Sequence, residues 1–247
     1  MWTTALLIAA VLIGSSMQRI TGMGFALVAS PFLVLLLGPS DGVIVVNVCG
    51  VLTAAVVLLR VFRHIDWRRY GVLAFWAVLG IIPGSYVVQF VPGAWLEISI
   101  GVLVAAGLTV SVSLGRVNVR DRRSYRVLAG MSSGFMNTTA GVGGPAVSIY
   151  AIATGWPQRS FAATMQPYFL TIGLVSLASK FALGSADVPQ LSVLVWALIG
   201  SACLIGLLIG DLLSEVVKPH VARRMLVVVA YLGSFTTILR GVVELLA

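Results

Sequence analysis

The sequence predicts an all-α integral membrane protein made of two homologous repeats in inverted orientation, with about 8–10 transmembrane or half-spanning helices. Apolar residues make up 59% of the 247 residues and charged residues only 10%, whereas about a quarter of a soluble domain is charged. Glycine clusters interrupt apolar stretches at corresponding places in the two halves, and arginine clusters separate the apolar runs. The lipid bilayer is therefore the expected surroundings of most of the chain.

The apolar runs mark the expected helices in order. A hydrocarbon core of about 30 Å needs about 20 helical residues, and the regions 2–17, 25–38, 127–140 and 145–156 are shorter than that. We expect these regions to be half-helices that meet at the glycine clusters, or short tilted spans. The long runs, which are expected to span, lie near residues 43–59, 70–91, 94–115, 161–183, 190–213 and 225–246.

The two halves share further landmarks in the same order. The pair Gly80/Gly84 corresponds to Gly206/Gly210, and both pairs have the GxxxG spacing that allows close helix packing in membranes. This order supports a duplicated unit. The predicted organisation is a single membrane domain over residues 1–247, with repeat 1 at 1–115 and repeat 2 at 127–247, joined by a basic cytoplasmic loop at 116–126.

The basic residues predict the orientation, because basic loops stay in the cytoplasm. The loop at residues 184–189 has no positive charge, although it corresponds to the first basic cluster of repeat 1. This inversion predicts five passages per repeat, both termini outside, and a multi-pass protein of the cell membrane; a parallel arrangement with four passages per repeat is the alternative. The basic clusters are Arg60, Arg63, Arg68 and Arg69; Arg116, Arg120, Arg122, Arg123 and Arg126; and Lys218, His220, Arg223 and Arg224.

The remaining composition excludes several classes of function. The net charge of +8 is explained by topology, so no nucleic-acid partner is expected. Cys49 and Cys203 lie in apolar runs and indicate neither a disulfide nor a metal site. The only histidines, His64 and His220, fall in loops, and the chain has no HExxH motif, acidic pair or Walker A sequence. We expect no enzyme activity and no cofactor.

The glycine clusters, Thr21–Ala26 and Ala140–Pro145, are the candidate binding site. Glycine lets the backbone leave helical geometry and approach a ligand closely. The N–H groups freed at the start of the following half-helix, with its positive dipole end, form an anion site. We expect Gly143→Leu to block this approach and abolish transport while leaving folding intact. The candidate substrate-binding residues are Gly22, Gly24, Gly141, Gly143, Gly144, Pro145, Thr21, Asn137, Thr138, Arg19, Asn47 and Gln166.

Each of these residues also has a structural interpretation. Glycine is common in membrane helices for packing, and polar side chains such as Asn47 and Gln166 hydrogen-bond between helices. For Arg19, capping a cytoplasmic helix end is the commoner role, and contact with a substrate is the alternative. Other charged residues near segment ends are expected to snorkel or meet headgroups: Glu97, Lys180, Asp211 and Arg240.

At the two glycine clusters and the Gly143-Gly144-Pro145 proline, the chain resembles the TauE/SafE sulfite-exporter family of membrane permeases. The basic loop after the third segment and the two-repeat layout extend the resemblance over essentially the whole chain. The first glycine cluster departs from the family pattern, because it is thinned to Gly22-Met23-Gly24-Phe25. The resemblance implies a small sulfur-containing or organic anion as substrate, such as sulfite, sulfoacetate or a related sulfonate.

These observations predict a secondary transporter of small anions that works by alternating access, with its site at the repeat interface. A passive anion channel of the same architecture is the alternative. A proton or sodium ion is a possible coupling partner. The sequence indicates neither the direction of transport nor the oligomeric state.

Overall fold

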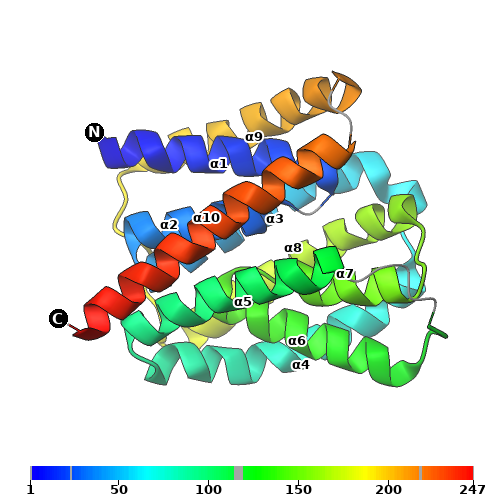
Figure 1. Cartoon of the computed structure of the whole chain (residues 1–247), viewed down its shortest axis with the longest axis horizontal. Coiled ribbons are helices and arrows are strands. Elements are labelled where there is room, and N and C mark those ends of the chain that lie inside the picture. Colours follow the sequence, from blue (N-terminus) through cyan, green and yellow to red (C-terminus); the bar gives the residue numbers. More distant parts are fainter. Residues whose placement is uncertain (1, 23, 114–118, 217–218, 247) are drawn as a thin grey trace.

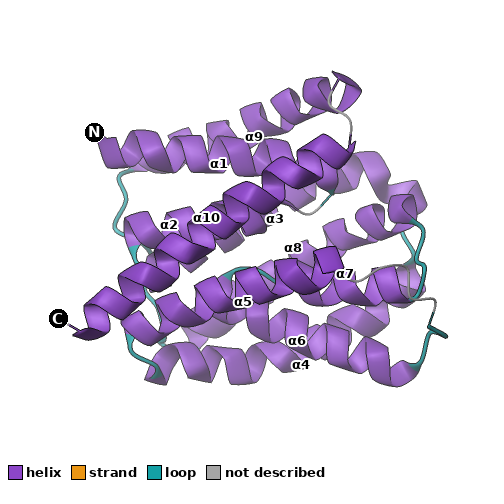
Figure 2. Ribbon diagram, in the orientation of Figure 1, coloured by secondary structure: helices purple, strands orange, loops and turns teal. Residues whose placement is uncertain are grey.

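The computed structural model describes residues 2–22, 24–113, 119–216 and 219–246. Within these ranges the regular structure is entirely helical (Figure 2), as the composition predicts. The described elements are, in chain order, α1 (Trp2–Thr21), α2 (Gly24–Leu37), α3 (Pro39–Val61), the 3₁₀ turn η1 (Phe62–His64), α4 (Trp67–Phe90), α5 (Gly93–Ser113), α6 (Arg123–Ala140), α7 (Gly144–Ala153), α8 (Gln158–Ala182), α9 (Val193–Val216) and α10 (Pro219–Leu246).

Among the described helices, seven are long and apolar enough to cross a membrane: α1, α3 continued by η1, α4, α5, α8, α9 and α10. α2 and α7 have 14 and 10 residues. At about 1.5 Å per residue they are about 21 and 15 Å long, which is less than the hydrocarbon core of about 30 Å. The prediction of short helices at 25–38 and 145–156 is therefore confirmed.

α1 is longer than the sequence predicts, with 20 residues instead of the short region 2–17. The helix continues through the polar residues Gln18 and Thr21 because their side chains find hydrogen-bond partners. The Thr21 hydroxyl donates to the Met17 carbonyl over 2.7 Å, and Gln18 Oε1 accepts from Thr53 Oγ1 of α3 over 2.9 Å. Polar side chains that are satisfied in this way do not interrupt a helix in an apolar environment.

The helices run roughly side by side (Figure 1), and the residues at the two ends of the bundle differ in charge. Both chain termini lie at the left end in Figure 1, together with the connections α2–α3, α4–α5 and α8–α9; we call this the termini end. The connections α3–α4 and α7–α8 and residues 119–122 lie at the opposite end. We call that one the arginine end, because it carries Arg60, Arg63, Arg68, Arg69, Arg120 and Arg122. The predicted loop residues Arg116 and Lys218 lie outside the described residues.

Long-range helix pairs dominate the packing: α1 lies against α9, α4 against α6, α3 against α8, and α5 against α10. Glycines permit the closest of these approaches. A Cβ atom at Gly134 or at Gly80 would overlap the facing backbone of Ala77 or Met131. A Cβ atom at Gly206 would lie 2.6 Å from the carbonyl oxygen of Leu12 on α1. The packing role predicted for the GxxxG pairs is confirmed at Gly80 and Gly206.

The outer surface is apolar. Large side chains on α9 and α10 stand fully out from the bundle; Val193 is 86% exposed and Phe235 is 67% exposed. A soluble protein would cover such continuous apolar faces, whereas a lipid-facing surface requires them. These helices therefore present their exposed faces to hydrocarbon.

The charged residues expected to snorkel have partners or are buried instead. Asp211 forms ion pairs with Arg19 and Arg60, which join α9 to α1 and α3. Glu97 is 1% exposed and lies 3.7 Å from Arg240. Lys180 is also 1% exposed. The snorkelling prediction is wrong for Glu97 and Lys180, because both side chains lie on the faces of α5 and α8 that pack inside the bundle, while Trp95 and Phe181 nearby are exposed.

Candidate functional site

The second glycine cluster forms a tight turn between α6 and α7, which we call glycine turn 2 (Gly141–Gly143). Gly141 ends α6 with a φ of 72°, a left-handed conformation that strongly favours glycine. Its N–H donates to the Asn137 carbonyl over 2.9 Å, and the next N–H, of Val142, donates to the Met136 carbonyl over 3.3 Å. A left-handed glycine whose N–H bonds to the carbonyl four residues back is an αL-type helix end.

α7 begins directly after this turn. Gly143 is its N-cap, and Pro145 occupies the first turn, where a missing N–H leaves no partner unsatisfied. The carbonyl of Gly143 accepts a hydrogen bond of 2.7 Å from Ser133 Oγ. The turn is thus fixed on its α6 side, and the first N–H groups of α7 have no partner within the helix.

The first cluster forms a comparable turn between α1 and α2, glycine turn 1 (Gly22–Gly24), of which Met23 lies outside the described residues. Gly22 has a φ of 88°, and its N–H donates to the Gln18 carbonyl over 2.7 Å. Its carbonyl accepts from Gln166 Nε2 over 3.4 Å. Both turns therefore rest on a glycine with positive φ, and each is followed by a short helix.

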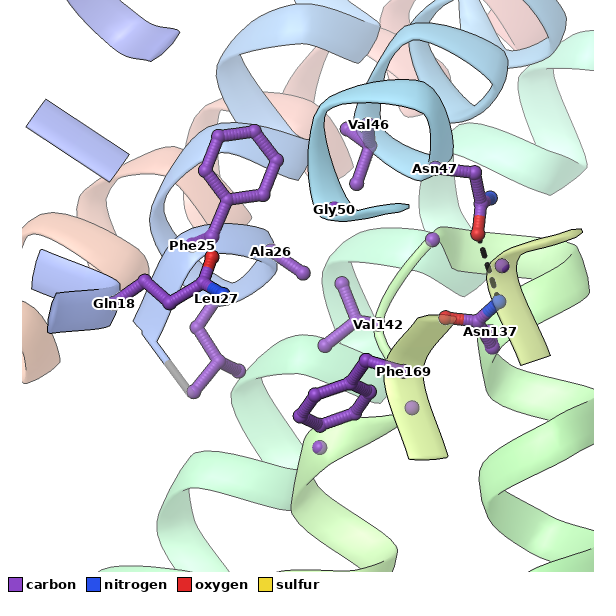
Figure 3. A pocket seen from close by; sticks show the side chains of 14 residues that line it. Gln18, Phe25, Ala26, Leu27, Val46, Asn47, Gly50, Asn137, Val142 and Phe169 are labelled. Atoms are coloured by element: carbon purple, nitrogen blue, oxygen red, sulfur yellow. Dashed lines mark hydrogen bonds between the residues drawn. The ribbon is translucent and has the colours of Figure 1, made fainter. Parts of the chain in front are cut away.

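The two short helices begin at one small cavity of about 40 Å³, which we call the central cavity (Figure 3). A cavity of this size accommodates on the order of one small ion or one to two water molecules. Its lining comes from α1, α2, α3, α6, glycine turn 2, α7 and α8. The lining residues are Gln18, Phe25, Ala26, Leu27, Val46, Asn47, Gly50, Asn137, Gly141, Val142, Gly143, Gly144, Phe169 and Gly173.

The polar side chains of the central cavity are held by one another. Asn137 Nδ2 donates to Asn47 Oδ1 over 2.8 Å (Figure 3) and to Ser176 Oγ over 3.0 Å. Gln18 Oε1 accepts from Thr53 Oγ1 over 2.9 Å, whereas Gln18 Nε2 has no acceptor among the described residues. All lining side chains are neutral. The cavity therefore combines amide groups, an available amide donor and two helix N-termini.

The family model of the sulfite exporter TauE/SafE matches residues 6–236, which include both glycine turns and every residue that lines the central cavity. The chain belongs to the TauE/SafE family. Comparisons with curated proteins and with solved structures gave no match. TauE/SafE proteins are integral membrane transporters, so this one is a multi-pass membrane protein for which a small-molecule substrate is implied.

In this TauE/SafE protein the central cavity brings together some of the residues singled out from the sequence. Asn47, Asn137, Gly141, Gly143 and Gly144 line it. Gly24 begins α2, whose next three residues line the same cavity.

The other predicted site residues lie around the cavity, outside its described lining. Gln166 donates to the carbonyls of Ala162 and Gly22, and the Thr21 hydroxyl donates to the Met17 carbonyl. Thr138 shares a hydrogen bond of 2.9 Å with Ser176. Pro145 packs against Gly107 of α5, and Arg19 forms an ion pair with Asp211 of α9. These residues support the turns and helices that shape the TauE/SafE cavity.

The reasoning behind Gly143→Leu needs correction. A Cβ atom at Gly143 would lie 2.8 Å from Ser133 Oγ and 2.9 Å from the Ser133 carbonyl oxygen. The side chain would collide with α6 and would not simply fill the cavity. We therefore expect this substitution to destabilise the fold, in contrast to the expectation from sequence.

Several lining residues were missed from the sequence. Gln18 lies one helical turn before Gly22, and Phe169 and Gly173 follow Gln166 at helical spacing on α8. That spacing was the available signal for α8. Phe25, Val46 and Val142 carried no signal, because an apolar residue in a membrane helix has the same appearance whether it faces a cavity, lipid or another helix.

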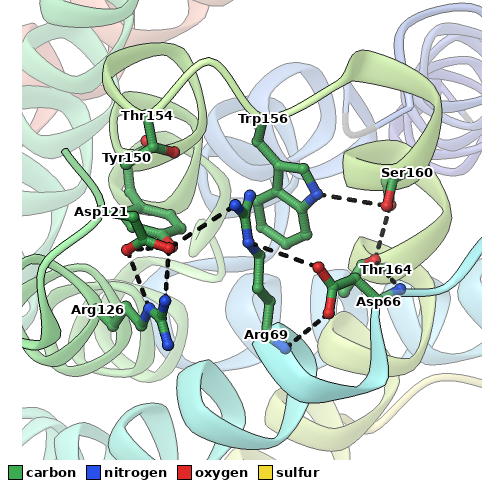
Figure 4. Close-up of polar contacts among 9 residues, drawn as sticks. All are labelled: Asp66, Arg69, Asp121, Arg126, Tyr150, Thr154, Trp156, Ser160 and Thr164. Carbon is green, nitrogen blue, oxygen red and sulfur yellow. Dashed lines mark hydrogen bonds and ion pairs between the residues drawn. The ribbon is translucent and has the colours of Figure 1, made fainter. Parts of the chain in front are cut away.

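At the arginine end of the TauE/SafE protein a second polar cluster joins four segments (Figure 4). Asp121 accepts two hydrogen bonds from Arg126, of 3.0 and 2.6 Å, and one of 2.9 Å from Tyr150 on α7. Arg69 of α4 lies 3.7 Å from Asp121 and stacks over the Trp156 ring at 4.6 Å from its centroid. The two hydrogen bonds from Arg126 lower the pKa of Asp121, and the hydrogen bond from Tyr150 and the positive charge of Arg69 act in the same direction.

Proposed function

We propose that this protein is a secondary transporter of small anions, such as sulfite or a sulfonate, that binds its anion in the central cavity and works by alternating access. The observation that carries the proposal is that two short helices, each preceded by a glycine turn, start at the same cavity. The first N–H groups of a helix lack partners within the helix and bear its positive dipole end. Two such ends directed at one small space favour a negative ion.

The neutral lining supports transport rather than tight storage of the anion. A buried cation beside the anion would strengthen binding greatly in a low dielectric. Dipoles and amides stabilise the anion more weakly, which allows it to leave on either side. The volume of about 40 Å³ favours a small, compact anion over a bulky organic one in this conformation.

The helix pairing supports two inverted five-helix repeats, α1–α5 and α6–α10. If α1 corresponds to α6 and α4 to α9, the contact of α1 with α9 corresponds to that of α6 with α4. Under the same correspondence α3 is equivalent to α8 and α5 to α10, so each of these two contacts joins a helix to its own counterpart in the other repeat. α1 enters the bundle from the termini end and α6 from the arginine end (Figure 1). With the arginine end in the cytoplasm, both termini lie outside.

Uptake of radiolabelled sulfite by proteoliposomes tests the proposal, with an imposed proton gradient, an imposed sodium gradient, or neither. Accumulation above equilibrium that collapses when the gradient is dissipated is the expected result, and it identifies the coupling ion. Flux that only equilibrates under every gradient points to a passive channel. Uptake no greater than in protein-free liposomes, for sulfite and for a panel of sulfonates, contradicts the proposal.

A further inference from the structure

Lys180 is a buried lysine without a partner. It is 1% exposed, near the end of α8. No described residue accepts a hydrogen bond from its Nζ, and no described carboxylate lies within 4.0 Å of it. An ammonium group removed from water and left unpaired is strongly unfavourable. Such a group either loses its proton or meets an anionic partner, and an ionisable side chain inside a membrane protein is a candidate functional residue.

Lys180 lies on the side of α8 that faces the central cavity. Phe169, Gly173, Ser176 and Lys180 are spaced by four, three and four residues, so they form one stripe along the helix. Phe169 and Gly173 line the cavity. The hydroxyl of Ser176, one turn before Lys180, bonds to Asn137, which also lines it. The stripe therefore places Lys180 on the same face of α8 as the cavity, about two helical turns beyond Gly173.

Polar side chains on and beside this stripe continue toward the termini end. Thr138 Oγ1 and Ser176 Oγ are 2.9 Å apart, and Ser85 of α4 bonds to Ser179 over 2.6 Å. α8 then ends at Ala182, and the α8–α9 connection lies at the termini end (Figure 1). Lys180 is thus the last charged residue of α8 before that connection.

A purely structural role for Lys180 does not account for its burial without a partner. A lysine in the last turn of a helix interacts favourably with the dipole, but it normally extends its ammonium group to water. Lys180 does not, because its residue is covered almost completely. The dipole alone also leaves all three N–H donors without an acceptor.

We propose that Lys180 is a second anion-binding residue on the route between the central cavity and the termini end. Its ammonium group donates hydrogen bonds to the small anion after the anion leaves the neutral cavity, or before it enters. The inference rests on the proposed transport function and assigns a charged residue to the outer part of the same path.

The test compares Lys180→Met, which keeps length and removes charge, with Lys180→Arg, which keeps charge. Arg159→Met is the matched control, since Arg159 is an exposed cation on the same helix. Two quantities are measured: the sulfite concentration dependence of initial uptake, and the rise in Tm that sulfite, sulfate or chloride causes in detergent. We expect Lys180→Met to raise the apparent KM for sulfite about tenfold and to reduce the anion-dependent rise in Tm, since only the contribution of the central cavity remains. Lys180→Arg and Arg159→Met are expected to retain both.

Lys180→Met should fold, because it removes an unpaired buried charge, so its Tm without anion should equal or exceed that of the natural protein. If it is not monodisperse, Lys180→Gln replaces it. Sulfite uptake with an unchanged KM in the methionine variant would overturn the role of Lys180 and leave the transport proposal intact. Anion stabilisation reduced in Lys180→Met, in a protein that transports none of the anions, would support the role of Lys180 and contradict transport. No anion effect on the natural protein in either measurement would overturn both.

Discussion

At the scale of single residues, the same amino acid has opposite roles in this protein. Gly143 is needed because a Cβ atom at this position would lie 2.9 Å from the Ser133 carbonyl oxygen. Gly50 of α3 lines the central cavity, and no atom lies within 4 Å of where its Cβ would be. The first glycine supports the fold. The second only leaves space, so it is the position at which the cavity can be filled without strain.

We expect Gly50→Val to reduce anion uptake about tenfold or more, because the added methyl groups enter the cavity. We expect little change in Tm, because glycine is unfavourable within a helix and its replacement offsets part of any loss of stability. Uptake by proteoliposomes and melting in detergent measure the two effects. The matched control is Gly200→Val on α9, which also has open space at its Cβ. Equal uptake by the two variants would argue against the central cavity as the binding site.

At the scale of helices, close contact and ionic contact hold different parts together. α4 and α6 approach through glycines, whereas the arginine end is joined by Asp121, Arg126, Tyr150 and Arg69 (Figure 4). Packing of the first kind depends on shape and hardly on pH. Contacts of the second kind depend on ionisation, so the two can be separated experimentally.

Gly134→Ala should destabilise the protein by about 1–3 kcal/mol, since the new methyl group overlaps the Ala77 backbone and forces α4 and α6 apart. Gly71→Ala on α4 has open space at its Cβ and serves as control. Melting in detergent, followed by tryptophan fluorescence, should show a lower Tm for Gly134→Ala alone. A normal Tm would mean that α4 and α6 are farther apart than described.

The lowered pKa of Asp121 predicts a pH dependence at the arginine end. A carboxyl group whose pKa is lower in the folded state stabilises the fold above its unfolded pKa, about 3.9, and this contribution is lost as pH falls through the folded value. Asp121→Asn should therefore lower Tm at pH 7. The difference in Tm from the natural protein should shrink as the pH is lowered below about 4. A difference that stays constant between pH 7 and pH 3 would show that the cluster owes nothing to the ionised carboxylate.

At the scale of the whole molecule, neither half is complete without the other. α1 finds its main partner in α9, and α6 finds its own in α4. The central cavity likewise takes its lining from α1–α3 and from α6–α8. Site and fold are therefore products of both halves together.

The orientation in the membrane follows from the charge difference between the two ends, and it can be tested by labelling. In a background without Cys49 and Cys203, Asp187→Cys at the termini end should react with a membrane-impermeant thiol reagent in intact cells. Arg63→Cys at the arginine end should react only after the membrane is opened. Both substituted side chains are exposed. The reverse pattern would place the arginine end outside and contradict the positive-inside assignment.

The sequence was informative where chemistry forces a choice of residue. The turns at Gly22 and Gly141 could be predicted, because a left-handed backbone and a hydrocarbon solvent leave few alternatives to glycine. The extension of α1 to Thr21 could not, since Gln18 and Thr21 look like the end of an apolar segment until their hydrogen bonds are known. Burial of Lys180 was also inaccessible, because it depends on which face of α8 packs inside the bundle.

The pairing of α1 with α9 has a consequence for how the protein is made. Ser16 of α1 donates a hydrogen bond of 2.9 Å to the Gly206 carbonyl, and 190 residues separate the two. At a synthesis rate of about 5–20 residues per second, α1 waits on the order of 10–40 s for this partner. During that interval Arg19 also lacks Asp211, its ion-pair partner on α9. Until α9 is inserted, α1 is therefore without the helix against which it mainly packs in the finished protein.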